Sequence, residues 1–586
     1  LMIRFALVVL VALSPFAVHA HPAGESLHQI FDEEWELRLG ENPLLATSVG
    51  VHAYDDRMPD VSAEAVRRSA DRRREILDRL GKIDREKLSI QDRINYTIFR
   101  DQMRDFVAEW EYGAYQIPLN SDSGFHSSMA FLPTRMPFFT AEDYENYISR
   151  LREFPRYFDQ HVSNMRLGLE RGMTLPSEVL EGIDETIAVH VVDEAEESVF
   201  WAPFTRFPSS VTEDERERLR NEGAGAIRDS VVPAYKSFLE FWTTKYVPGA
   251  RTTLGASKLP DGQEYYGYLV EHFTTLDVTP EEIHEIGLSE VARIRSEMEE
   301  IIDRVGFDGT FDEFLAFLRT DPRFYAETPQ DLLERAAWIA KQMDGKLPSL
   351  FDTLPRLPYT VEPVPDHIAP KYTAGRYVPP SKGSTRPGIY WVNTYDLSSR
   401  PLYTLEALTL HEAVPGHHLQ GALAMELEEL PDFRQYSYLS AFGEGWGLYS
   451  EWLGLEAGFY DDPYSNFGRL TYEMWRANRL VVDTGIHAFG WTRQQARDFM
   501  AENTALSLHE ISTEVDRYIS WPGQALAYKM GELEIRRLRE KAERELGADF
   551  EVREFHDAVL LTGSVPLPVL ADQIDRYIAG VRDQGE

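Results

Sequence analysis

Apolar residues recur at helical spacing along most of the chain. Ile94, Ile98, Phe106 and Trp110 are separated by multiples of four, the repeat that places side chains on one face of a helix. Several helix starts have the pattern of a capping box, in which a threonine hydroxyl accepts from the third helical N–H and the Glu or Gln there bonds back. This pattern predicts helices that begin after Thr212, Thr279, Thr310 and Thr492, with Glu215, Glu282, Glu313 and Gln495 as the reciprocal partners.

Strand patterns are scarce by comparison. The best candidate is the segment 388–395, GIYWVNTY, which alternates aromatic and β-branched residues and follows Arg386-Pro387. The sequence therefore predicts a mainly α protein with a small β-sheet. A Pro/Gly-rich stretch at 354–387 and a softer boundary near Pro248 both contain aromatic residues, unlike flexible linkers. We expect one compact body with two helical lobes, residues 21–250 and residues 251–586.

The first 20 residues have the pattern of a secretory signal peptide. Arg4 precedes an apolar core at 5–18, and Val18-His19-Ala20 is a small-x-small cleavage site. The alternative is a membrane anchor, but no other apolar run reaches 18 residues. We expect an exported protein, periplasmic or extracellular, without stable membrane insertion once the signal is removed. The sequence contains no cysteine, so it offers neither disulfides nor an attachment point for a cysteine-linked lipid.

The charge balance narrows the classes of partner. The chain has 586 residues with 60 Lys+Arg and 97 Asp+Glu, a net charge of −37. This excess disfavours nucleic-acid binding and attraction to anionic lipid, both of which require basic surfaces. With 43% hydrophobic and 12% aromatic residues, the composition is that of a globular protein with a large core.

Three of the 16 histidines lie within eight residues, in the segment HEAVPGHH at 411–418. An acidic residue directly after a histidine resembles HExxH, in which two histidines one helical turn apart bind zinc and the Glu is the general base. In a regular helix, however, His411 and His417 are roughly 120° off a common face. Pro415 lacks an N–H and clashes with the carbonyl of His411, and Gly416 permits unusual backbone angles.

These features predict a bulge that brings a second histidine beside His411. We favour His417 as that ligand and keep His418 as the alternative. The other interpretation is a helix that ends at Pro-Gly with two surface histidines, but it leaves the adjacent His-Glu pair unexplained.

A catalytic zinc site needs a third protein ligand and an open position for water. Glu444 lies between two glycines in FGEGWGLYSE, 27 residues after His417. Glu451 follows two helical turns later on the same face, where it is placed to orient a ligand histidine. The alternative for both glutamates is a solvated helix face.

Together, the segments HEAVPGHH, RPGIYWVNTYDL, FGEGWGLYSE, RLVVDTGIHAFGWT and RYISWPGQALAYKMG resemble the secreted bacterial family called domain of unknown function 885. That family is in turn similar to the glutamate-zincin peptidases, such as the thimet oligopeptidase and angiotensin-converting enzyme groups. The resemblance implies a mainly helical, two-lobed fold with a groove between the lobes and one zinc ion per chain. It also implies His411, His417 and Glu444 as ligands and Glu412 as the catalytic glutamate.

Other residues near these motifs have predicted supporting roles. The resemblance matches Tyr528 to the tyrosines of a C-terminal helix in those peptidases, where a hydroxyl donates to the oxyanion; Tyr518 is the second choice. We assign Arg517 to substrate binding, together with Tyr390 and Asn393 in the predicted strand, which is placed to pair with an extended peptide. Arg479, Asp483 and His487 are four residues apart on one helix and form either a polar relay behind the site or a structural ion network.

The expected function is zinc-dependent hydrolysis of oligopeptides, with Glu412 as the general base. Two alternatives keep the metal: hydrolysis of a small amide or ester, and iron chemistry on two histidines and one carboxylate. A third is an exported protein that binds metal or peptide without catalysis.

Overall fold

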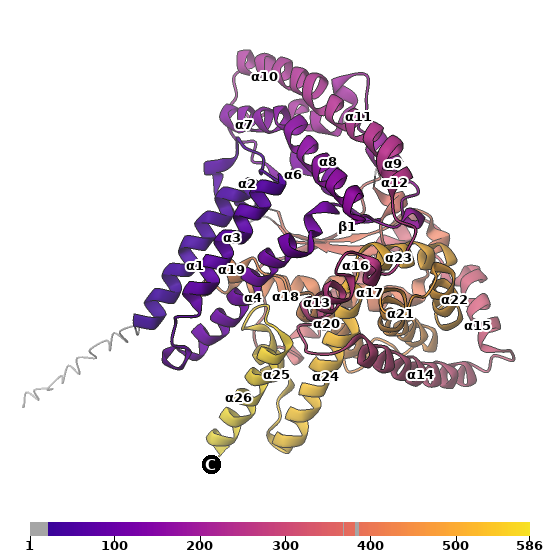
Figure 1. The fold of residues 1–586 in the computed structure, drawn as a ribbon. Coiled ribbons are helices and arrows are strands. Elements are labelled where there is room, and N and C mark those ends of the chain that lie inside the picture. The colour runs from indigo at the N-terminus through magenta and orange to yellow at the C-terminus, as the bar shows by residue number, and fades with distance from the viewer. Residues whose placement is uncertain (1–21, 367, 381–385, 586) are drawn as a thin grey trace, which may run out of the picture.

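The computed structural model of the protein describes residues 22–366, 368–380 and 386–585, and the predicted signal peptide lies outside them. The described chain is mainly helical with one small sheet, as predicted. In Figure 1 the strand β1 lies near the middle of the molecule, with α7–α11 above it and α24–α26 below it. The first half of the chain forms α1 (Pro22–Glu41), α2 (Pro43–Ser48), α3 (Ala63–Leu80), α4 (Ile90–Tyr112), α5 (Phe125–Met129), α6 (Leu132–Arg135), α7 (Ala141–Arg152), α8 (Phe154–Arg171), α9 (Ile183–Ala188), α10 (Glu213–Ala226), α11 (Val232–Phe241) and α12 (Val247–Gly249).

The second half contains the longest helices and the sheet. Its helices are α13 (Gly262–Thr274), α14 (Pro280–Val305), α15 (Phe311–Thr320), α16 (Pro329–Asp344), α17 (Leu405–Glu412), α18 (His417–Glu426), α19 (Asp432–Gln435), α20 (Ser440–Leu453), α21 (Pro463–His487), α22 (Arg493–Asn503), α23 (Leu508–Ser520), α24 (Ala527–Leu546), α25 (Val552–Leu560) and α26 (Leu567–Gly585).

The sheet has three strands in the order β1-β3-β2, namely β1 (Tyr359–Pro363), β2 (Gly375–Val378) and β3 (Gly388–Val392). β3 pairs in parallel with β1 and antiparallel with β2. The predicted strand is therefore confirmed, although it ends at Val392 rather than at residue 395. The prediction that it pairs with a peptide along its edge is wrong, because β3 is the central strand and both of its edges are already hydrogen-bonded.

All four predicted capping boxes form. The hydroxyls of Thr212, Thr279, Thr310 and Thr492 accept from the third N–H of α10, α14, α15 and α22, and the Glu or Gln at that position bonds back. α4 likewise covers the predicted apolar repeat, with Ile94 and Ile98 buried. These elements follow from local sequence because their first turns satisfy their own free N–H groups.

The two largest clusters of buried side chains both draw from each side of residue 250. Residues 22–250 therefore share their core with the rest of the chain. The long helices pack closely: a Cβ on Gly531 of α24 would lie 1.9 Å from the carbonyl oxygen of Ala441 in α20. This contact requires glycine and fixes α20, which carries Glu444, against α24, which carries Tyr528.

Among the described residues, no helix combines the length and the apolar character needed to cross a membrane.

Candidate metal centre

The break between α17 and α18 brings the two histidines together. α17 ends at Glu412, α18 begins at His417, and Ala413 and Gly416 have non-helical backbone angles. The N–H of Gly416 donates to the carbonyl of Leu410 at 3.0 Å, so the chain folds back on the helix it has just left. A Cβ on Gly416 would lie 1.9 Å from the carbonyl oxygen of His411. The Pro-Gly pair therefore makes the kink that the sequence predicted.

Three side chains converge at this kink. Oε2 of Glu444, from α20, lies 3.5 Å from Nε2 of His411 and 3.3 Å from Nε2 of His417. Within the described residues, these three form the one group whose potential ligand atoms all lie within 4.8 Å of one another. His411 is buried, whereas the side chains of His417 and Glu444 are each 15% exposed. The group is therefore open to solvent on the His417 side.

A second layer of contacts fixes the orientation of His411. Its Nδ1 lies 2.8 Å from Oε1 of Glu451, two turns after Glu444 on α20, and the same oxygen lies 3.3 Å from the guanidinium of Arg476 on α21. A Cβ on Gly447 would lie 2.6 Å from the His411 ring, so this glycine gives the imidazole its space. Nε2 of His411 is thus directed at Glu444.

The electrostatics of the group favour added positive charge. Burial lowers the pKa of His411, but its hydrogen bonds to Glu444 and Glu451 and the charge of Glu412 outweigh burial and raise the pKa to about 10. Burial raises the pKa of Glu444, but the charge of His417 and the hydrogen bond from His411 outweigh this effect. The pKa of Glu444 therefore lies well below its usual value. Carboxylates thus dominate the electrostatics of this group.

Glu412 and two tyrosines surround this group. The backbone N–H of Tyr377, in β2, donates to Oε2 of Glu412 at 2.8 Å, which places the sheet directly beside α17. The hydroxyl of Tyr438 donates to Oε1 of Glu444 at 3.0 Å. The ring of Tyr528, at the start of α24, lies 4.1 Å from the guanidinium carbon of Arg479.

Tyr528 has an unusual electrostatic environment. Burial and the charge of Glu444 raise its pKa, but the charges of Arg517 and Arg479 and a hydrogen bond from Gln524 outweigh them, so its pKa is lowered. Its hydroxyl is consequently a stronger hydrogen-bond donor than an ordinary tyrosine.

His418, the alternative ligand, lies apart from this group. Its Nε2 is 3.1 Å from the carbonyl of Leu357 and its Nδ1 is 3.2 Å from the hydroxyl of Tyr377. Burial lowers its pKa to about 4, so the ring is neutral. Both ring nitrogens are occupied by contacts with the sheet region.

Tyr518 is also fully engaged. Its hydroxyl donates to Glu514 at 2.9 Å and accepts from Trp475 at 2.8 Å and from Arg479 at 2.9 Å. The side chain is 1% exposed. This network leaves the hydroxyl no capacity for a substrate oxygen.

The predicted relay on α21 connects to α13 and α23 rather than to the ligands. Asp483 accepts from the hydroxyl of Tyr266 at 2.7 Å and from the N–H of Gly523. Nδ1 of His487 accepts from the N–H of Ala256 at 2.9 Å. Arg479 alone reaches the site, through its stacking on Tyr528. These three residues form a structural network behind Tyr528.

The residues assigned to substrate binding divide into two groups. Tyr390 is buried, with its hydroxyl 3.3 Å from that of Thr409, and the buried amide of Asn393 donates to backbone carbonyls of residues 369–373. Both are corrected to structural roles because neither is exposed to a ligand. Arg517 is partly exposed, and its guanidinium lies 2.8 Å from Gln524 and 3.4 Å from the hydroxyl of Tyr528.

Sequence reasoning missed Tyr438, Arg476 and the N–H of Tyr377. Tyr438 lies in a loop before α20 and has no motif around it, and a backbone N–H has no residue signature. Arg476 was accessible to pattern reasoning, because it lies one turn before Arg479 in the same polar stripe of α21.

Comparison with known proteins places the chain in a family without assigning it an activity. The profile of DUF885, described as a bacterial protein of unknown function, matches residues 43–574. The chain belongs to this family. A search of the curated proteins found no match for the DUF885 chain.

Two solved structures share the fold of this DUF885 protein. One is described as "the putative lipoprotein from Colwellia psychrerythraea" and is 29% identical, with a TM-score of 0.89 over 95% of this chain and 99% of that chain. The other is "a putative lipoprotein of unknown function from Shewanella oneidensis", 16% identical, with a TM-score of 0.68 over 94% of this chain and 99% of that chain. The second likeness shows the fold alone.

Proposed function

We propose that this DUF885 protein is an exported zinc-dependent peptidase that hydrolyses oligopeptides. The observation that carries the proposal is the convergence of His411, His417 and Glu444, with Glu412 directly after the first ligand. The resemblance of these motifs to the glutamate-zincin peptidases supports the same activity. The N-terminal segment and a structural relative described as a "putative lipoprotein" support export.

The donor set fits a divalent ion of the zinc type. Two donors that each lie about 2 Å from a tetrahedral zinc are roughly 3.3 Å apart, and the two imidazole nitrogens lie 3.5 and 3.3 Å from Oε2 of Glu444. Two imidazoles and one carboxylate leave a position open, as catalytic rather than structural zinc sites do. Glu451 is the outer carboxylate that commonly accompanies a metal-binding histidine.

When bound there, zinc lowers the pKa of water toward about 7 and polarises the scissile carbonyl. Glu412 accepts the proton of the attacking water and delivers it to the leaving amine. The N–H of Tyr377 holds one oxygen of Glu412 and thereby fixes the direction of the carboxylate. Tyr528 donates to the oxyanion of the tetrahedral intermediate, and its lowered pKa strengthens that hydrogen bond.

A peptide-library digest tests the proposal. Metal-loaded wild-type protein should cleave peptides, a chelator should stop cleavage, and Glu412→Gln should lower kcat by about 10²- to 10⁴-fold while retaining the metal. Glu429→Gln, an exposed glutamate beyond the end of α18, is the matched control and should keep full activity.

The other outcomes separate the alternatives. Full activity in Glu412→Gln would refute the assignment of the base. Release of small amides or esters without peptide cleavage indicates a small-substrate hydrolase. Bound iron instead of zinc points to oxidative chemistry, and peptide binding without cleavage indicates a binding protein.

A further inference from the structure

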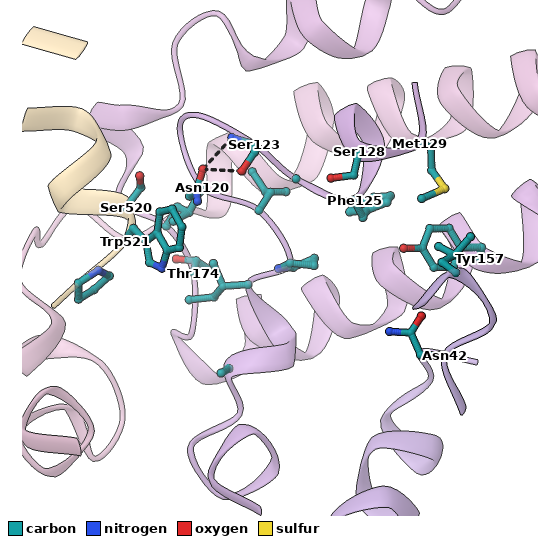
Figure 2. Close-up of a pocket in the computed structure, with 18 of the residues that line it drawn as sticks. Asn42, Asn120, Ser123, Phe125, Ser128, Met129, Tyr157, Thr174, Ser520 and Trp521 are labelled. Atoms are coloured by element: carbon teal, nitrogen blue, oxygen red, sulfur yellow. Dashed lines mark hydrogen bonds between the residues drawn. The ribbon is translucent and has the colours of Figure 1, made fainter. Parts of the chain in front are cut away.

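A cavity lined by the N-terminal helices, α13 and the end of α23 has no assigned role. Its volume is about 820 Å³, and the segment 519–522, which begins in the last turn of α23, forms part of its wall. In Figure 2, Ser520 and Trp521 lie on one side of the cavity, and Phe125, Met129 and Tyr157 lie on the other. Cavities of this size hold peptides or other small ligands.

The charged residues that line the cavity are arginines, of which Arg150 is 0% exposed and lies 3.7 Å from the carboxylate of Asp55. Arg135, Arg150 and Arg251 line the cavity, and none of its described lining residues is Asp or Glu. The chain as a whole carries 97 acidic residues and a net charge of −37. A recess lined by one sign of charge and by apolar walls concentrates ligands of the opposite sign.

The three arginines are not equivalent. Arg150 donates to the carbonyls of Pro43 and Arg57 at 3.0 Å, and Arg251 donates to the carbonyl of Thr174 at 2.7 Å. Arg135, at the end of α6, has neither a hydrogen-bond nor an ion-pair partner among the described residues; its guanidinium lies 5.7 Å from the ring centre of Phe131. Arg135 is therefore the cation at this cavity that remains available to a ligand.

Hydrogen bonds at the end of α23 connect the cavity wall with Tyr528. Ser520 is the last residue of α23, and its Oγ accepts from the N–H of Ser121 at 3.0 Å. One turn earlier on α23, the guanidinium of Arg517 lies 3.4 Å from the hydroxyl of Tyr528. Ser121 belongs to the loop 119–124, and other residues of this loop line the cavity.

We propose that this cavity binds a carboxylate-bearing segment of the peptide substrate while the scissile bond lies at the metal centre. Arg135 is the cation that binds this carboxylate. The inference rests on the proposed peptidase function and names its substrate class, acidic oligopeptides. The carboxylate is either that of an internal Glu or Asp or that of the peptide C-terminus. Both present the same chemistry to a guanidinium.

Binding to metal-loaded Glu412→Gln protein tests the inference without requiring turnover. The probes are acetylated hexapeptide amides with two Glu, two Gln or two Lys at matched positions, and the Gln peptide with a free C-terminus. Calorimetric titration should show the Glu peptide binding roughly tenfold tighter than the Gln peptide, and the Lys peptide weakest. Tighter binding of the free acid alone would assign the subsite to the peptide C-terminus.

Substitution at Arg135 identifies the subsite. Arg135→Gln should reduce the Glu-to-Gln affinity ratio to about 1–2, and Arg135→Lys should retain part of it. Arg544→Gln, which removes an exposed charge at the far end of α24, controls for net charge and should leave the ratio unchanged. An unchanged ratio in Arg135→Gln, or equal binding of all peptides by the parent protein, would overturn the inference.

The experiments distinguish failure of the proposed subsite from failure of the proposed peptidase function. Cleavage of Gln and Glu peptides at equal rates by wild type, together with equal binding, removes the subsite and leaves the peptidase intact. Selective binding of the Glu peptide without cleavage by metal-loaded wild type removes the peptidase and leaves an acidic-peptide binding site.

Discussion

Two buried clusters of charge lie beside α21, and they differ in how their charges are balanced. In one, the ammonium of Lys529, 0% exposed, lies 3.0 Å from Glu290 and 2.9 Å from both Glu473 and Glu532. Three arginines complete this cluster: Arg469 lies 2.9 Å from Glu473, Arg536 lies 3.1 Å from Glu532, and Arg293 contacts Glu290 and Glu473. Its carboxylates are neutralised within the protein.

The histidine cluster lacks this balance. Glu412, Glu444 and Glu451 gather around two histidines; Arg476 forms an ion pair with Glu451, and the charge of Arg376 acts on Glu412. Protonation of the histidines or a bound cation must supply the remaining charge. The comparison teaches that burial of charge does not by itself indicate function: the balanced cluster holds α14, α21 and α24 together, whereas the unbalanced one is the site at which we propose a bound cation.

Tyr528 and Lys529 are neighbours in sequence and belong to different clusters. Tyr528 interacts with Glu444 and Arg517 at the metal centre, and Lys529 faces Glu473 and Glu532. Substitutions at these two positions therefore separate the two roles within one turn of α24.

Lys529→Met should produce the largest loss of stability. Removal of the ammonium leaves three buried carboxylates with fewer partners, which costs about 3–5 kcal/mol of unfolding free energy. Denaturant titration measures this loss, and the folded fraction should still bind one metal ion. Lys541→Met on the same helix removes a partly exposed pair with Asp575 and should cost less than about 1 kcal/mol. Equal losses in both variants would contradict the structural role.

Tyr528→Phe should show the reverse pattern. Loss of one oxyanion donor lowers kcat by about 10²- to 10³-fold, with little change in unfolding free energy or metal content. Steady-state kinetics on the cleaved peptide, together with the same denaturant titration, measure both quantities. Tyr518→Phe is the companion variant, and we expect it to affect stability more than kcat because its hydroxyl bonds only to protein groups. A normal kcat in Tyr528→Phe would exclude this tyrosine as the donor.

Glu451→Gln tests whether the outer carboxylate strengthens metal binding. It removes the negative charge next to Nδ1 of His411 and retains a hydrogen-bonding side chain. Metal affinity should fall about 10- to 100-fold, which competition with a chelator measures. Unchanged affinity would indicate that Glu451 merely balances Arg476.

For Asp483, in the network on α21, we expect a pH-dependent effect on unfolding free energy that is smaller than the effect of Lys529→Met. Burial raises the pKa of Asp483 to about 7, despite hydrogen bonds from Tyr266 and Gly523, whereas an unfolded aspartate has a pKa of about 3.9. The stability gained by keeping the proton is therefore present below pH 4 and is lost as the pH rises through about 7. Relative to Asp483→Asn, wild type should lose about 2–3 kcal/mol of unfolding free energy between pH 5 and pH 8. A difference independent of pH would show that Asp483 does not titrate in this range.

Local features of the fold and of the site were predictable from the sequence. The capping boxes and the Pro415-Gly416 kink depend only on residues within one or two helical turns of each other. A short stretch of sequence therefore contains all the residues needed to predict them. The pairing of His411 with Glu451 was predictable once Glu444 was placed, because both glutamates lie on one face of α20.

Long-range arrangements were not predictable in the same way. The strand at 388–392 has the same pattern whether it is central or at an edge, and its position between β1 and β2 removes the expected peptide-pairing edge. Tyr390 and Asn393 resemble exposed site residues in sequence, yet partners from other segments bury them. The basic cavity likewise forms from arginines of three separate segments, in a chain whose composition indicates only an acidic surface.

The central claim is that His411, His417 and Glu444 hold one metal ion. Metal analysis of purified protein, wild type and variants, tests it most directly. We expect one zinc ion per wild-type chain, loss of zinc in His411→Ala and Glu444→Gln, and full retention in His418→Gln, whose ring bonds to Leu357 and Tyr377. Retention of zinc in His411→Ala, or its loss in His418→Gln alone, would contradict the claim.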